Sequence, residues 1–375
     1  MRIAIMGFGT VGSGAYEVAK ATDNIEVVKI LARHGRNGYE HLNDIITPNI
    51  EDITSDSSIE LVIESMGGVE PAREYVLACL NAGKHVVTPN KNLISACYEE
   101  LMAAATANSV KLKFTATAGG GIPWLFNLQR TKRCDTITEI RGIVNGTCNY
   151  ILDAMHDNGT DYNDILKKAQ ELGYAEANPA ADVEGTDTLR KAVISANIAF
   201  DTAIKEEAVP CFGINNITSK DIEWFNKRGY TCKLMMNAKR NDSTVCAYVE
   251  PTLFAKNTLE ANVKTNNNLI TLVGESIGTQ SFYGQGAGML PTGESVIQDV
   301  IDIMSNWGWM NRGIQLNGVA PQTGMVFNDD EIHRYYIRHE NGAGISEPIS
   351  VTKMHKIAKK YQEEGKPIFF AGIKE

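Results

Sequence analysis

The sequence predicts an α/β fold in which a doubly wound, parallel-sheet domain precedes an α+β domain. Short apolar segments alternate with helical segments over the first third of the chain, which is typical of β-α-β units. This alternation stops after Gly119–Gly121, where a mixture of helices and strands follows. The length of 375 residues suits two or three domains, at about 150 residues per domain.

The first domain is expected to span residues 1–125. Apolar segments rich in β-branched residues predict its strands at 2–6, 25–32, 61–64, 85–88 and 110–117. Helices are predicted between them at 13–22, 71–82 and 93–107. The second of these helices begins with Pro71 in its first turn and stops at Gly83, which are favourable residues for a helix start and a helix end.

The second domain is expected at 126–294, and an appendage at 331–375. The strands predicted for the second domain lie at 136–144, 244–249 and 269–273, and its helices at 147–156, 162–172 and 186–200. A helical region near 295–320 is expected to return to the first domain. The appendage is predicted to form a β-α-β unit, with strands at 333–338 and 367–372 and a helix at 350–364.

Composition excludes several classes of protein. The net charge of −9 opposes nucleic acid as the main partner, because phosphate binding needs a basic surface. No apolar run approaches the roughly 18 residues of a membrane span, and a strand from Arg2 leaves no room for a signal peptide. The seven cysteines form no C-x-x-C pair, so we expect reduced thiols in a cytoplasmic protein, without a zinc or disulfide framework. Cys134 and Cys148 have no histidine nearby in a recognisable motif, so inert buried thiols are favoured over nucleophiles.

A glycine motif follows the first predicted strand and opens a helix. The residues that fit G-x-G-x-x-G are Gly7, Phe8, Gly9, Thr10, Val11 and Gly12. Such glycines let the backbone reach a pyrophosphate at a helix N-terminus, so we interpret the motif as the phosphate loop of a Rossmann-type dinucleotide site rather than a plain glycine-rich turn. About 20 residues further on, where an NAD site usually has an acid, the chain has Arg33, which suits the 2′-phosphate of NADP(H). The alternative for Arg33 is a solvated loop residue.

Charged residues at two further places suggest chemistry. Lys91 follows the predicted strand 85–88, at the sheet edge where ligands gather, although a lone lysine there is more often a surface residue. The densest charged group consists of Glu176, Asp182, Asp187 and Lys191. Asp187 and Lys191 are spaced i, i+4 on a helix that is apolar on two sides, which favours a functional pair over a surface ion pair.

Six strings of residues together resemble homoserine dehydrogenases. They are GFGTVG at 7–12, TPNK at 88–91, TAGGGIP at 117–123, GIVNGTCNYIL at 142–152, ELGYAEANPAADVEGTDTLRK at 171–191 and FYGQGAGMLPTGESV at 282–296. The resemblance covers roughly residues 1–300, and 173–191 is its most specific part because no generic dinucleotide fold requires it. It implies a homodimer that reversibly reduces L-aspartate 4-semialdehyde to L-homoserine with NAD(P)H, in the biosynthesis of threonine, methionine and isoleucine.

The resemblance also implies roles for individual residues. Lys191 matches the family's proton donor and Asp187 its paired aspartate, with Lys91 as a third catalytic residue. The implied substrate-binding residues are Glu176, Asp182, Thr147 and Tyr174, and the implied cofactor-binding residues include Ser65, Lys91, Gly173 and Gly286. Main-chain carbonyls that hold a monovalent cation, typically Na⁺, match Thr115, Ala118, Gly120 and Ile122. Thr115 replaces a usual glutamate and Ala118 a usual valine, which leaves carbonyl ligation intact.

Two other functions fit parts of this pattern. Aspartate-semialdehyde dehydrogenase has a similar plan but requires a nucleophilic cysteine, and a non-catalytic nucleotide sensor could retain the fold. Longer homoserine dehydrogenases carry a C-terminal β-α-β-β-α-β domain that senses threonine. Because the appendage holds half of that module, we expect no inhibition by millimolar threonine. A single β-α-β unit must pack on the body of the chain or on a partner.

Overall fold

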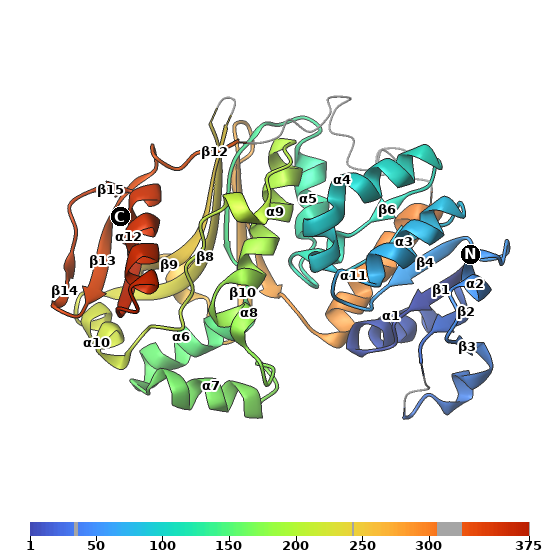
Figure 1. The fold of residues 1–375 in the computed structure, drawn as a ribbon, viewed down its shortest axis with the longest axis horizontal. Coiled ribbons are helices and arrows are strands. Elements are labelled where there is room, and N and C mark those ends of the chain that lie inside the picture. Colours follow the sequence, from blue (N-terminus) through green and yellow to red (C-terminus); the bar gives the residue numbers. More distant parts are fainter. Residues whose placement is uncertain (34–36, 242–243, 306–324, 375) are drawn as a thin grey trace. The chain divides into compact units, whose positions relative to one another are not determined.

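The computed structural model describes residues 1–33, 37–241, 244–305 and 325–374. The chain divides into two compact units. Figure 1 labels many of their helices and strands. Unit 1 comprises Met1–Asn127 and Ala287–Ala320, and unit 2 comprises Leu128–Gly286 and Pro321–Glu375. No helix in the described ranges is both long enough and apolar enough to cross a membrane.

Unit 1 contains a six-stranded parallel sheet in the order β3-β2-β1-β4-β5-β6. Its strands are β1 (Arg2–Met6), β2 (Glu26–Leu31), β3 (Ile46–Thr47), β4 (Leu61–Glu64), β5 (His85–Val87) and β6 (Leu112–Lys113). Its helices are α1 (Thr10–Lys20), α2 (Glu51–Thr54), α3 (Ala72–Asn81), α4 (Lys91–Ala107) and α11 (Met289–Met304), and α5 (Trp124–Thr131) leads into unit 2. The predicted Rossmann-type parallel sheet is confirmed.

Several details of unit 1 differ from the sequence prediction, including the unpredicted β3 and α2 and the start of α4 at Lys91. Helix α1 begins at Thr10, directly after the N-cap Gly9, rather than at residue 13. Pro71 is the N-cap of α3 rather than a residue of its first turn. The strand predicted at 110–117 is only β6, because the chain coils into a 3₁₀ turn at Thr115–Thr117. Of the helical region expected near 295–320, α11 covers the part up to Met304, and residues 306–320 lie outside the described residues.

The core of unit 1 joins the sheet to α1 and α11. Buried side chains of β1, β2 and β4 pack with those of the two helices in one apolar cluster, and α11 contributes Val296, Ile297, Val300 and Ile303. Because the strands are parallel, their carboxyl ends share one edge of the sheet, and the loops after β1, β4 and β5 meet there. This edge positions the glycine motif and Lys91.

Unit 2 contains a mixed ten-stranded sheet in which β11-β10-β7-β8-β9-β16-β13-β14 are neighbours. Its strands are β7 (Ile137–Ile143), β8 (Tyr230–Asn241), β9 (Thr244–Ala255), β10 (Asn267–Gly274), β11 (Gly278–Gln285), β12 (Met325–Val326), β13 (Ile332–His339), β14 (Gly342–Ile345), β15 (Ile349–Ser350) and β16 (Ile368–Ile373). Its helices are α6 (Gly146–Asn158), α7 (Tyr162–Glu171), α8 (Ala180–Val183), α9 (Thr186–Phe200), α10 (Ser219–Lys227) and α12 (Val351–Glu363). The predicted helix at 186–200 is confirmed as α9, whereas β8, β11 and α10 were not predicted.

The C-terminal segment belongs to the sheet of unit 2. The strands predicted at 333–338 and 367–372 and the helix at 350–364 are confirmed as β13, β16 and α12. Strand β16 pairs in parallel with β9, and β13 pairs with β16 and with the unpredicted β14. Of the two arrangements left open by the sequence, the structure therefore has the one in which the segment packs on its own chain.

Candidate active site

The glycine motif of unit 1 forms a loop with no room for side chains at two of its glycines. Gly7 has a φ of +87°, and a Cβ there would lie 2.8 Å from the Ser65 carbonyl oxygen. A Cβ at Gly12 would lie 2.2 Å from the carbonyl oxygen of Gly7. Around a Cβ at Gly9, by contrast, no described atom lies within 4 Å. The loop is thus tightly packed at Gly7 and Gly12 and open at Gly9. A pyrophosphate that approaches the N-terminus of α1 closely requires such an opening.

Ser65 supports this loop from the neighbouring strand end. Its hydroxyl donates to the carbonyl oxygen of Gly7, at 2.8 Å. Phe8 packs edge-on against Tyr16 and Tyr39, which anchors the outer side of the loop. Arg33 lies exposed beyond the end of β2, and residues 34–36 lie outside the described residues.

A buried carboxylate that the sequence analysis missed connects the loops after β4 and β5. Glu64 is fully buried, and burial raises the pKa of its carboxyl group above the usual value. It accepts hydrogen bonds from the Thr88 hydroxyl, from the Asn90 amide at 3.3 Å and from the Met66 N–H at 2.7 Å. Asn90 in turn caps α4, because its side chain accepts from the N–H of Leu93. Lys91 is the first residue of α4 and directly follows the Asn90 cap.

The turn that contains the expected cation ligands also lies in unit 1. Gly119 and Gly120 have φ values of +94° and +57°, so the chain reverses through conformations that favour glycine. The carbonyl of the buried Ala118 accepts no hydrogen bond from any residue that the structure describes. A buried carbonyl without a partner, in a turn of main-chain oxygens, fits a hard monovalent cation. Thr115, Gly120 and Ile122 lie in the same turn.

The charged residues of α9 form a buried ion pair in unit 2. The Lys191 Nζ lies 2.8 Å from Oδ2 of Asp187 and donates to the Val144 carbonyl at 2.7 Å. The two side chains are only 11% and 9% exposed, so the alternative of a surface ion pair is wrong. Asp187 lies in the first turn of α9, where the positive end of the helix dipole also favours a carboxylate.

Asn145 connects this pair to Asp182, and sequence analysis did not single it out. Its Nδ2 donates to Asp182 Oδ1 at 2.7 Å and to Asp187 Oδ2 at 2.9 Å. Its Oδ1 accepts from the N–H of Cys148, which fixes the orientation of the amide and caps α6. Its position two residues before Thr147, in the string NGT, was the only signal that could have indicated it.

Among the described residues of unit 2, a hydrogen bond joins only two of the remaining expected substrate and cofactor residues. The Thr147 hydroxyl donates to the Tyr174 carbonyl, so these two residues are joined. Gly173 (φ +76°) and Glu176 are exposed, and no contact places the Glu176 carboxylate in the buried cluster within the described ranges. Gly286 lies at the far end of β11, packed against the amide of Asn268.

The cysteines do not supply a nucleophile for this cluster. Cys134 is exposed, so the prediction of a buried thiol is wrong for it, and none of the bonds that the structure describes in the cluster involves it. Cys148 is buried as predicted, and burial raises the pKa of its thiol well above the usual value. Its Sγ donates to the Asp182 carbonyl at 3.2 Å. Burial likewise raises the pKa of Cys211 to about 12. A thiol that stays protonated is a poor nucleophile, so the pattern opposes thioester chemistry at this site.

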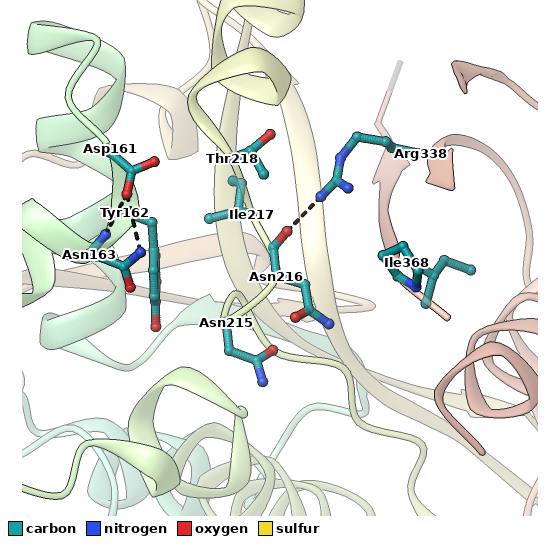
Figure 2. Close-up of a pocket in the computed structure, with 10 residues that line it drawn as sticks. Asp161, Tyr162, Asn163, Asn215, Asn216, Ile217, Thr218, Arg338 and Ile368 are labelled. Carbon is teal, nitrogen blue, oxygen red and sulfur yellow. Dashed lines mark hydrogen bonds between the residues drawn. The ribbon is translucent and has the colours of Figure 1, made fainter. Parts of the chain in front are cut away.

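A cavity of about 320 Å³ in unit 2 is lined by none of these residues. Figure 2 shows Asp161 and Asn163 on one side of it and Arg338 and Ile368 on the other. Arg338 Nη2 donates to the Asn216 carbonyl at 2.6 Å across this cavity. The chemistry-bearing residues therefore mark the candidate site, and cavity size does not.

Comparisons with known proteins agree on one family. Residues 7–115 match the family described as the NAD binding domain of homoserine dehydrogenase, and residues 123–301 match the family described as homoserine dehydrogenase. The homoserine dehydrogenase of Bacillus subtilis is 36% identical over 334 residues, covering 86% of this chain and 76% of the relative. That of Corynebacterium glutamicum is 40% identical over 331 residues, covering 81% and 72%. The crystal structure of a homoserine dehydrogenase from Thiobacillus denitrificans superimposes with a TM-score of 0.85 at 28% identity, covering 100% and 98%.

Proposed function

The chain belongs to the homoserine dehydrogenase family, and from this premise we propose how its own residues carry the reaction. The activity is that of an NAD(P)-dependent oxidoreductase acting on a CH–OH group, which interconverts L-aspartate 4-semialdehyde and L-homoserine. When bound, the nicotinamide cofactor supplies the hydride for the aldehyde carbon. The protein must then stabilise and protonate the developing alkoxide.

Lys191 is the proposed proton donor, and its hydrogen bonds are the observation that carries this role. An ammonium group has three N–H donors. Asp187 and the Val144 carbonyl take two of them, and no further acceptor for Nζ lies among the described residues. The third N–H is therefore free to face the substrate oxygen. Asp187 orients the ammonium group through the ion pair, and Asn145 holds Asp187 in place.

Carboxylates and donors around this pair would recognise the rest of the substrate. Asp182, held by Asn145, is the proposed partner of the substrate ammonium group, together with Glu176. Lys91 and Thr147 are the proposed donors to its α-carboxylate. The Thr147 hydroxyl already has an orientation set by the Tyr174 carbonyl.

The proposed cofactor residues are the Gly7–Gly12 loop, Ser65, Lys91, Gly173 and Gly286. Arg33 would favour NADP(H) over NAD(H), because a guanidinium group makes charge-assisted bonds to a 2′-phosphate. Main-chain carbonyls of Thr115, Ala118, Gly120 and Ile122 would hold a monovalent cation. We also propose a cytoplasmic homodimer, on the basis of family resemblance.

The Lys191→Ala variant tests the proton donor. It should lower kcat for homoserine oxidation by about 10²-fold or more, the scale of lost general acid–base catalysis. Cofactor affinity should stay within about twofold, because Lys191 bonds Asp187 and the Val144 carbonyl and, among the described residues, none of the proposed cofactor residues. The readouts are the absorbance of reduced nicotinamide and a fluorescence titration of NADPH. Lys168→Ala, an exposed lysine paired with Glu171, is the matched control. Near-normal turnover of Lys191→Ala would reject this role and direct attention to Lys91.

A further inference from the structure

Helix α11 packs against the turn at Thr115–Ile122 along one of its faces. Its core face carries Val296, Ile297 and Val300, which are fully buried with β1 and β4. A second face carries Pro291, Ser295 and Asp299, which are spaced four residues apart and so lie along one side of the helix.

The first two residues of this second face contact the glycines of the turn. Ser295 is 9% exposed, and its hydroxyl donates to the Gly120 carbonyl at 2.6 Å. A Cβ at Gly121 would lie 2.8 Å from the Pro291 Cβ, so helix and turn touch through a position that excludes a side chain. Both contacts fix the C-terminal half of the turn.

Asp299 fixes the start of the turn. Its Oδ2 accepts the N–H of Thr115 at 2.9 Å, although the side chain is only 1% exposed. Burying a carboxylate is unfavourable unless it is well paired. The nearest cation, Lys113, lies 4.0 Å from its Oδ1 and closer to Asp302, at 2.9 Å. The Thr115 N–H is therefore the close partner that orients Asp299.

The same helix is also packed backbone to backbone on the phosphate helix α1. A Cβ at Gly293 would lie 2.5 Å from the Gly14 carbonyl carbon, and one at Gly14 would lie 2.2 Å from the Met289 carbonyl oxygen. Because the two backbones are in direct contact at these glycines, α1 and α11 cannot move closer together. Any group that holds the turn on α11 thus also holds it in register with the phosphate loop.

We infer that Ser295 and Asp299 are positioning residues that hold the Thr115–Ile122 turn in its binding conformation. They act through backbone hydrogen bonds at the two ends of the turn, and neither is required to touch substrate or cofactor. That Ser295 and Asp299 hold the turn rests on their two hydrogen bonds to it. That holding the turn promotes cation binding rests on the proposed cation site.

The test compares Ser295→Ala and Asp299→Leu, which lacks an acceptor for the Thr115 N–H, with Asp302→Leu in the full chain. Asp302 lies on the same helix and pairs with the same lysine, but its carboxylate does not bond the backbone of the turn. Hydrogen–deuterium exchange of peptides spanning 115–122 should quicken about tenfold in the first two variants, the scale of one lost hydrogen bond, and less than twofold in Asp302→Leu. The second readout is the rise of the thermal midpoint with NaCl, measured at an ionic strength kept constant with choline chloride. In the same two variants, the NaCl concentration that gives half of this rise should be about tenfold higher than in the wild type. Ser295→Thr, which keeps the hydroxyl, should restore both values.

Each outcome decides between the proposals. Unchanged exchange in Ser295→Ala and Asp299→Leu, or equal exchange in all three variants, would overturn the positioning role. If NaCl leaves the wild-type midpoint unchanged, the cation proposal fails, and the exchange data still decide the positioning role alone. Faster exchange in the two variants with an unchanged NaCl response would show that the turn is positioned for a ligand other than Na⁺, and would overturn the stated consequence.

Discussion

Lys233 shows how a single buried charge makes stability depend on pH. It lies on β8 with no exposed surface, and its Nζ donates to Asn149 Oδ1 at 2.8 Å and to the Val263 carbonyl at 2.7 Å. No carboxylate lies within 4.0 Å of it in the described part of the chain. Burial lowers the pKa of its ammonium group from 10.5 to about 8.

The sign of the pH effect follows from which state binds the proton more tightly. The unfolded chain keeps the Lys233 proton up to about pH 10.5, whereas the folded chain releases it near pH 8. The free-energy cost of burying the charged Lys233 is therefore complete below pH 8, and it disappears as the pH rises toward 10.5. Relative to Lys233→Met, the wild-type free energy of unfolding should rise by about 3 kcal/mol over this interval. Urea unfolding at several pH values measures it, and the exposed Lys168→Met is the control. Parallel pH profiles for wild type and Lys233→Met would contradict the shifted pKa.

Arg33 carries the expected cofactor preference. It is exposed beyond β2, so removing its side chain should leave the fold unchanged. Arg33→Ala should weaken NADPH binding roughly tenfold or more, the scale of a lost charge-assisted contact, and NADH binding by less than twofold. Fluorescence titrations of both cofactors measure this, with the exposed Lys20→Ala as the control. Equal weakening of the two cofactors would place the preference elsewhere.

At the residue scale, sequence predicted the charged pair proposed for catalysis better than the groups that hold it. The Asp187–Lys191 pair was predicted because i, i+4 spacing on a helix is visible in the sequence. Glu64 and Asn145 were not, because a residue that bonds partners 24 or 42 positions away leaves no periodic pattern. Their burial is a product of tertiary packing.

At the scale of single elements, Gly185 controls where α9 begins. It is the N-cap with a φ of +91°, and a Cβ there would lie 2.8 Å from the Cys211 Sγ. Gly185→Ala should lower the free energy of unfolding by about 2 kcal/mol or more, from left-handed strain and from the contact together. It should also lower kcat, because Asp187 lies two residues further on.

A matched glycine separates the two causes. Gly159 is the C-cap of α6 with a φ of +64° and no described atom within 4 Å of a Cβ, so Gly159→Ala reports strain alone. Urea unfolding should show a larger loss of unfolding free energy for Gly185→Ala than for Gly159→Ala. Cys211→Ala, added to Gly185→Ala, should recover only the difference between these two losses, because it removes the contact and leaves the strain. Equal losses at the two glycines would contradict the contribution of the Cys211 contact.

The apolar pattern explains why some elements were predicted and why some others were missed or overestimated. Helix α9 has the predicted bounds because its apolar residues are bounded by Gly185 and by the left-handed Asp201. Strand β8 was missed because seven consecutive residues are buried, among them the polar Lys233 and Asn237, so no alternation marks it. Strand β6 was overestimated because the apolar residues after it belong to the buried turn at Thr115–Thr117.

At the scale of the whole molecule, the C-terminal segment is part of the body. Phe369 and Phe370 of β16 are fully buried, and the ring of Phe370 lies 4.2 Å from that of Phe212. The buried Asp221 of α10 accepts from the Tyr336 hydroxyl at 2.6 Å and from Arg338 Nε at 2.7 Å. The strands that a ligand-sensing module would use are thus engaged in pairing within the chain, which supports the expected insensitivity to threonine. Threonine therefore has to be titrated on the intact chain.

Truncation after Asp330 should consequently destroy unit 2 rather than remove an accessory. It would delete β13, β14, β15, α12 and β16, uncover the edge of β9 paired with β16, and expose Phe212 to water. We expect insoluble protein or the loss of a cooperative melting transition by circular dichroism. Tyr336→Phe and Arg338→Met are the controls, because each cuts one bond to Asp221 and keeps the sheet pairing. Each should stay soluble and active, with a thermal midpoint lowered by a few degrees, since one buried hydrogen bond contributes about 1 kcal/mol or somewhat more. A soluble, active truncated chain would mean that the ten-stranded sheet does not depend on its C-terminal strands, and that the segment is an appendage after all.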